Sequence, residues 1–190
     1  MSGTALDPVA CAAFVVVAFA LAGCAQAAWL SSSISHRVAW PLDCGATFRG
    51  RRVFGASKTV RGFVVMVPAT SLAFVLVALA DPGGVWQLPV SDYGLLGAVA
   101  GAGFMAAELP NSFFKRQLQV APGAAARGRV SRPVFAIVDH IDSVCGALGA
   151  MALLVTVPRW TIVYLLPVGW IVHRVFSALT FQLGGKVRAA

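Results

Sequence analysis

Five long apolar runs constrain the fold of this chain more than any other feature of its sequence. They span residues 9–30, 63–80, 93–107, 133–157 and 160–183. A membrane-spanning helix needs about 20 mostly apolar residues. Charged residues make up 12% of the chain, whereas soluble domains carry roughly 25%. We therefore predict an all-α, polytopic integral membrane protein with about five transmembrane helices, forming a single membrane-embedded domain over residues 1–190.

Lysine and arginine alternate between the segments that separate these runs. The N-terminal segment has none, the four following loops have six, none, five and one, and the tail has two. By the positive-inside rule, this pattern predicts a cell (inner) membrane protein with its N-terminus outside and its C-terminus and basic loops in the cytoplasm. The net charge of +8 does not indicate a nucleic-acid partner, because the cations lie between apolar runs, where topology or anionic lipid explains them.

The cysteines predict neither a disulfide framework nor a zinc site. Cys11, Cys24, Cys44 and Cys145 form no CxxC pair and have no metal-ligand spacing with histidine. The sequence Leu21-Ala22-Gly23-Cys24 resembles a lipoprotein cleavage box, but no Lys or Arg precedes it, as a signal peptide would require. We expect a retained first helix.

Carboxylates concentrate in one stretch, residues 108–146. Of the 7 acidic residues in the chain, it contains Glu108, Asp139 and Asp142. The two aspartates are three residues apart, which places them on one face of a helix. A charge at the centre of a spanning helix costs about 2.5–3.5 kcal/mol on insertion scales and is by default functional. A shared Mg²⁺ would explain the pair. The alternatives are an ion pair to Lys115, Arg116 or Arg132, and a later helix start that leaves both acids in solvent.

Glu108 is a weaker candidate for the metal shell. We expect it to end the third helix just before Pro110, where it either completes the ligand set or is a solvated helix end. His140 lies between the two aspartates, and we expect it to pack or to face the interface, because Mg²⁺ prefers oxygen ligands.

Two basic segments are candidates for phosphate binding. If Pro110 begins a short helix, the side chains of Ser112, Lys115 and Arg116 share one face and form a phosphate cradle. The alternative is a basic edge that contacts lipid phosphates. The loop before the second apolar run resembles a P-loop only loosely, because the glycine before its lysine is missing and no strand precedes it. Its candidate residues are Gly55, Ser57, Lys58, Thr59 and Arg61.

Taken together, three segments resemble the CDP-archaeol synthase family, which is related to the phosphatidate cytidylyltransferases. They are WPLDCGATFRGRRVFGASKTVRG, ELPNSFFKRQLQVAPG and DHIDSVCGAL, at residues 40–62, 108–123 and 139–148. The resemblance implies a five-span enzyme that uses CTP and Mg²⁺ to transfer CMP to a lipid phosphate, with release of pyrophosphate.

The resemblance also implies roles for individual residues. Asp139 and Asp142 match paired aspartates that bind metal near the CTP phosphates. The two basic segments match the family's nucleotide-binding segments through Lys58, Thr59 and Arg61, and through Ser112, Lys115 and Arg116. We expect Lys58, Lys115 and Arg116 to act in catalysis together with the two aspartates.

The sequence departs from the family pattern near its acids. Glu108 stands where the family has Asp, Pro110-Asn111 replace a more basic stretch, and His140 replaces Gln. These departures leave open a family member with changed activity. A non-enzymatic transporter or lipid-binding protein is a further alternative, since intramembrane acids also serve as ion or proton sites. Whether the protein is a monomer or a homodimer also stays open.

Overall fold

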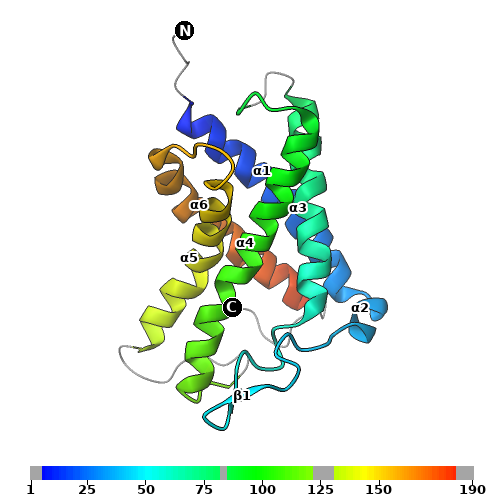
Figure 1. Ribbon diagram of the computed structural model, residues 1–190, viewed down its shortest axis with the longest axis vertical. Helices are drawn as coiled ribbons and strands as arrows, with labels where there is room; N and C mark the ends of the chain where they lie inside the picture. Colours follow the sequence, from blue (N-terminus) through cyan, green and yellow to red (C-terminus); the bar gives the residue numbers. More distant parts are fainter. Residues whose placement is uncertain (1–5, 82–84, 122–130, 183–190) are drawn as a thin grey trace.

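The computed structural model describes residues 6–81, 85–121 and 131–182, which form a helical bundle with a small hairpin at one end (Figure 1). The predicted all-α membrane fold is confirmed. The described elements are α1 (Pro8–Ser31), α2 (Ser33–Arg37), β1 (Thr47–Phe48), β2 (Arg51–Arg52), α3 (Val60–Ala80), α4 (Val90–Gln117), α5 (Ser131–Met151) and α6 (Arg159–Gln182).

Helix α4 is the centre of the bundle, with α3 on one side and α5 on the other (Figure 1). Its glycines allow both neighbours to approach closely. A β-carbon on Gly97 would lie 2.6 Å from the Thr70 carbonyl oxygen of α3, and one on Gly103 would lie 2.4 Å from the Gly146 carbonyl oxygen of α5. Small residues at helix contacts in membranes let backbones pack in this way. The Gly/Ala-rich sequence of residues 94–107 therefore accounts for the close approach of α4 to both neighbours.

The outward faces of the helices carry large apolar side chains. Leu72 on α3 and Ile171 on α6 are 59% and 55% exposed. Such faces are stable against lipid tails, whereas soluble monomers rarely expose large contiguous apolar patches. Among the described residues, α1, α3 and α4 are long and apolar enough to span a membrane, and α5 contributes a shorter apolar stretch over Ile141–Met151.

The C-terminal part of α4 differs from the prediction. Glu108 does not end this helix and Pro110 does not begin a new one, because α4 continues through Pro110 to Gln117. The prediction relied on the intrinsic cost of proline inside a helix. Helices in a bundle tolerate proline because packing and side-chain hydrogen bonds compensate. Asn111 and Ser112, directly after Pro110, are buried in this packing.

Helix α5 is shorter than predicted. It ends at Met151, and residues 152–157 form turns and extended chain before α6 begins at Arg159. The β-branched residues of this stretch, together with Pro158 after them, disfavour a helix. The Trp86 indole donates to the exposed Thr156 carbonyl oxygen at 3.0 Å. This hydrogen bond satisfies one backbone carbonyl group of the non-helical stretch.

The basic segment between the first two long helices contains structure that the sequence did not predict, namely α2 and the β1–β2 hairpin. Thr47 pairs with Arg52 and Phe48 with Arg51, across a turn at Arg49 and Gly50 in which both φ angles are positive. The hairpin lies beside the C-terminal end of α4 (Figure 1). Arg51 donates to the Gln117 carbonyl oxygen, and the rings of Phe48 and Phe113 lie 5.7 Å apart.

The first basic segment (residues 31–62) and the described part of the second (residues 108–121) therefore meet at one end of the bundle. Arg127 and Arg129, which the sequence analysis counted in the second of them, lie outside the described residues. The side chains of Arg132 and His140 lie outside them as well.

Candidate active site

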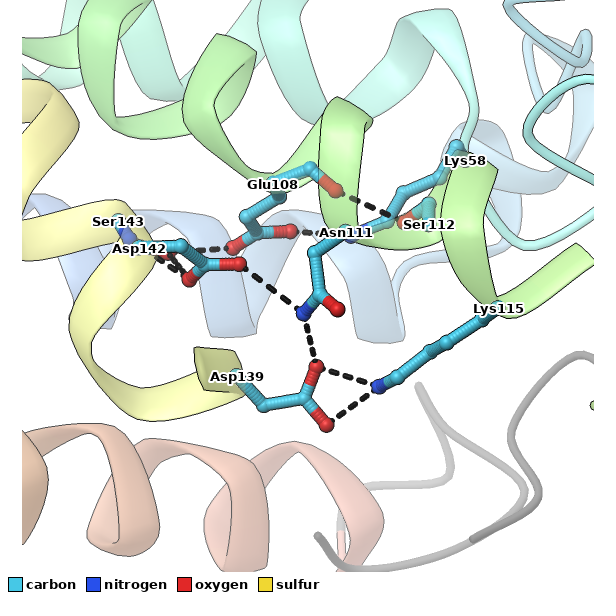
Figure 2. A network of polar contacts seen from close by, with 8 residues as sticks. All are labelled: Lys58, Glu108, Asn111, Ser112, Lys115, Asp139, Asp142 and Ser143. Atoms are coloured by element: carbon cyan, nitrogen blue, oxygen red, sulfur yellow. Dashed lines mark hydrogen bonds and ion pairs between the residues drawn. The ribbon is translucent and has the colours of Figure 1, made fainter. Parts of the chain in front are cut away.

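Eight polar side chains gather where α4, α5 and the loop before α3 meet, and we call them the polar cluster (Figure 2). Its members are Lys58, Glu108, Asn111, Ser112, Lys115, Asp139, Asp142 and Ser143. Helical spacing explains the contribution of α4, because residues 108, 111, 112 and 115 recur on one face. The same spacing places Asp139, Asp142 and Ser143 of α5 opposite them. Only tertiary structure adds Lys58.

Asn111 joins the two aspartates. Its Nδ2 donates to Asp139 Oδ1 at 2.6 Å and to Asp142 Oδ2 at 3.2 Å. The Asn111 residue is 7% exposed. The carboxylates predicted as a pair thus converge on one amide group from the neighbouring helix.

Two ion pairs neutralise carboxylates at the edges of the cluster. The Lys115 ammonium group pairs with Asp139, and the Lys58 ammonium group pairs with Glu108. The ion-pair alternative for Asp139 is therefore realised with one of its predicted partners, Lys115. For Asp142 the described residues supply amide and hydroxyl donors, from Asn111 and Ser143, and no lysine or arginine partner.

Ser143 connects the two halves of the cluster. This residue is 2% exposed, and its hydroxyl group lies 2.9 Å from Glu108 Oε1 and 3.2 Å from Asp142 Oδ1. A hydroxyl group has one proton to donate and two lone pairs, so it serves one carboxylate at a time as donor. Asp142 also accepts from the Ser143 backbone N–H at 2.7 Å. Ser143 therefore links the two carboxylates, because its hydroxyl group can donate to Glu108 while its backbone N–H donates to Asp142.

Some of the predicted phosphate-binding residues lie in the polar cluster, and others lie elsewhere. Lys58, Ser112 and Lys115 belong to the cluster, although the Ser112 hydroxyl donates to its own helix at the Glu108 carbonyl oxygen, 2.9 Å away. Arg61 Nη1 lies 3.5 Å from Ser35 Oγ, beside α2. Thr59 caps α3 and pairs through its backbone with Pro41.

Arg116 has buried nitrogens that reach no acceptor among the described residues. Its Nε and Nη1 atoms form no hydrogen bond within the described part of the chain. A buried guanidinium group is unfavourable unless an anion or another acceptor reaches it. This favours an anion-binding role for Arg116.

The loop that carries Lys58 is held by Asp43, whose role the sequence analysis missed. The Asp43 carboxylate pairs with Arg52 and accepts backbone N–H bonds from Gly45, Phe54 and Gly55 at 3.2, 3.1 and 2.9 Å. The hydrogen bond from Arg52 is the main reason that the pKa of Asp43 lies well below its usual range. Gly55 is buried with φ +87°, and Ser57, two residues later, is exposed.

Sequence reasoning also missed Asn111 and Ser143 as members of the cluster. Asn111 is three residues after Glu108, and Ser143 is four residues after Asp139, so helical spacing contained a signal for both. Asp43 had a different signal, as the one acid among six cations in residues 31–62.

This chain is similar to known proteins along most of its length. The model of the CarS-like family, CDP-archaeol synthase, matches residues 12–188. A CDP-archaeol synthase from Halobacterium salinarum is 33% identical over 162 residues, covering 77% of this chain and 81% of the relative. One from Pyrococcus furiosus is 31% identical over 150 residues, with the same two coverages.

A solved structure is also similar. It is described as an intramembrane enzyme for archaeal membrane lipids biosynthesis, and it matches with a TM-score of 0.53 and 28% identity over 83% of this chain and 91% of that one. These likenesses support an enzyme over the transporter or lipid-binding alternative. The chain belongs to the CDP-archaeol synthase family, whose members are intramembrane CTP-dependent cytidylyltransferases.

Proposed function

We propose that this protein transfers CMP from CTP to a lipid phosphate, either phosphatidate-like or an archaeal ether lipid phosphate, forming CDP-lipid and pyrophosphate. The observation that carries the proposal is the polar cluster, in which carboxylates of α4 and α5 meet lysines from both basic segments. Family membership supports the same chemistry.

The reaction places heavy demands on charge neutralisation. An oxygen of the lipid phosphate attacks the α-phosphorus of CTP in line, and the bond from that phosphorus to the bridging oxygen breaks, so that pyrophosphate leaves with the electron pair. Both reactants are anions, so binding and alignment dominate catalysis. The nucleophile needs no general base, because the second pKa of a phosphate monoester is about 6.

The basic residues hold the triphosphate in this proposal. Lys58 and Lys115 are paired with Glu108 and Asp139, and they would exchange these carboxylates for phosphate oxygens when CTP binds. Arg116 adds the buried nitrogens that have no acceptor among the described residues. Gly55, Ser57, Thr59, Arg61 and Ser112 complete the predicted phosphate-binding set. Cations aimed at the developing charge stabilise the transition state.

The donor set of the cluster fits a divalent cation. Asp139 and Asp142 converge on one point, and the buried Asn111 Oδ1 beside them has no donor within the described residues. Hard oxygen donors of this kind are the ligands that Mg²⁺ prefers. Asp139, Asp142 and Glu108 would hold Mg²⁺, which when bound neutralises phosphate charge and polarises the α-phosphoryl group. Glu108 would join the set by releasing Lys58, which is then available to a phosphate oxygen.

A direct assay tests the function. Purified protein is incubated with CTP, Mg²⁺ and either phosphatidate or a diether glycerol phosphate, and CDP-lipid and pyrophosphate are quantified. We expect both products with at least one lipid, and their loss in Asp142→Asn. If wild-type protein forms neither product with either lipid, the proposal is wrong.

We also propose five membrane spans, with the N-terminus outside and both basic segments in the cytoplasm. The exposed Cys44 lies in the first of these segments and reports its side. In a variant that retains only this cysteine, a membrane-impermeant maleimide should label Cys44 in inside-out vesicles and not in intact cells. Labelling in intact cells would refute this orientation.

A further inference from the structure

The Asn111 side chain presents two different groups to the polar cluster. Figure 2 shows its amide nitrogen pointing at both aspartates and its oxygen pointing away from Asp142. The nitrogen therefore lies between one oxygen of Asp139 and one oxygen of Asp142, which come from successive turns of α5. A cation shared by Asp139 and Asp142 would be bound at the same point.

The other half of the amide is not satisfied. Asn111 Oδ1 is buried and accepts no hydrogen bond from the described residues. The whole Asn111 residue is 7% exposed. A buried acceptor without a donor is unfavourable. The amide oxygen and nitrogen are nearly equal in size, so a half-turn about the last side-chain bond exchanges them without a steric change.

That half-turn changes what the cluster can bind. It would place Oδ1 beside the oxygens of Asp139 and Asp142, an arrangement that is repulsive by itself and favourable around a divalent cation. Asparagine carbonyl oxygens and carboxylates are common ligands of such cations. The described residues contain no group of three His, Cys, Asp or Glu side chains placed to hold a metal ion, and Glu108 can join the aspartate pair only by releasing Lys58. A neutral oxygen donor beside the pair would therefore add to the ligand set.

We infer that Asn111 is a divalent-cation ligand of this site through Oδ1, and that its amide group turns from bridging Asp139 and Asp142 to coordinating the cation with them. This inference rests on the proposed function, because it concerns the cation that the nucleotide requires. Asn111 thereby adds a neutral donor to the set.

The sequence provides an unusually clean test, because Asn111 is the only asparagine in the chain. Protein made by cell-free synthesis with [¹³Cγ,¹⁵Nδ2]-asparagine therefore carries a label at this one side chain. Mg²⁺ is titrated into the full chain in lipid nanodiscs without CTP, and the carboxamide signals are followed by NMR. Mn²⁺ binding is measured in parallel by EPR.

We expect the ¹³Cγ and NH₂ signals of Asn111 to shift together, with the same saturation as cation binding. Unchanged signals at saturating Mg²⁺ would show that Asn111 is not a ligand. Absence of cation binding without CTP would also overturn this inference. In either case CDP-lipid formation by wild-type protein, measured separately, would leave the proposed function standing.

Variants provide a second readout that does not depend on activity. Asn111→Leu has a similar shape without an amide, and we expect it to weaken Mn²⁺ binding about tenfold or more. Gln117→Leu is the matched control, because it removes an amide of the same helix whose Nε2 has no partner in the described chain. Equal Mn²⁺ affinity in Asn111→Leu and wild type would contradict the inference, provided that both proteins keep the same Tm.

Discussion

Lys58 and Glu108 are 50 residues apart in the chain, and their side chains form an ion pair between the loop before α3 and the middle of α4. This pair connects the first basic segment to the carboxylates of the polar cluster. Its side chains are 24% and 21% exposed, so solvent reaches both partners. In the proposed reaction, this contact is replaced by a contact between Lys58 and the triphosphate.

Removal of the Lys58 charge should impair catalysis more than folding. We expect Lys58→Met to lower kcat/KM for CTP by about 10²-fold or more, as for other preorganised groups that stabilise transition-state charge. Because the ion pair is partly exposed, we expect a small change in Tm. Steady-state assays with CTP and thermal unfolding in detergent measure the two effects. Near-normal kcat/KM in Lys58→Met would remove this residue from the mechanism.

Ser143 should act as a positioning residue through Glu108 and Asp142. We expect Ser143→Ala to lower activity about 10- to 100-fold, the range for groups that orient metal ligands. We also expect an increased requirement for Mg²⁺, because the two carboxylates lose their common partner.

Ser71→Ala is the matched control for this variant. The Ser71 hydroxyl donates to the Gly94 carbonyl oxygen at 2.8 Å, between α3 and α4 and outside the polar cluster. If both serine variants lower activity equally and leave the Mg²⁺ dependence unchanged, Ser143 has only a packing role.

Contact between α4 and α5 should be sensitive to one methyl group. A β-carbon on Gly146 would lie 2.2 Å from the Ala107 β-carbon and 2.4 Å from the Gly103 carbonyl oxygen. We expect Gly146→Ala to destabilise the protein by about 1–3 kcal/mol, typical of overpacking. Activity should fall as well, because the helices that carry Glu108 and Asp142 are forced apart.

Gly149 offers a control on the same helix, since a β-carbon there meets nothing within 4 Å. We expect Gly149→Ala to be neutral or to stabilise by up to about 1 kcal/mol, because alanine favours a helix more than glycine does. The Gly146→Ala and Gly149→Ala variants are compared by their Tm and by their CDP-lipid formation. Equal stability of the two variants would contradict the close helix contact.

Acid should release the loop that carries Lys58. The pKa of Asp43 is lowered in the folded protein, chiefly by the hydrogen bond from Arg52, so the carboxylate contributes stability that is fully present above its unfolded pKa. That unfolded value is about 3.9. The contribution should be constant between about pH 5 and 7 and should decline as the pH falls below about 4.

Asp43→Asn tests this assignment. We expect the free energy of unfolding of the variant to be about 1.5–3 kcal/mol lower than that of wild type at neutral pH, the range for hydrogen bonds to charged groups. Below about pH 4, the stability of the variant should decline less than that of wild type. Tm and limited proteolysis of the loop against pH measure the effect. A wild-type pH profile in Asp43→Asn would show that another group is responsible.

Local sequence patterns were sufficient for much of the architecture. The apolar runs predicted the long helices because a bilayer requires continuous apolar stretches with internally satisfied backbones. They failed where local propensity and packing disagree, since Pro110 ends a helix by propensity but lies inside α4. They also predicted α5 to continue to Val157, whereas the chain leaves the helix after Met151.

Spacing along helices determined part of the site. A spacing of three residues from Asp139 to Asp142 places both on one face, and this follows from the helical repeat alone. Which groups face them was decided by tertiary structure. Glycines at the contact bring α4 close to α5, so that Asn111 reaches both aspartates, while the loop held by Asp43 brings Lys58 to Glu108. These contacts join residues far apart in the chain, and no local pattern specifies them.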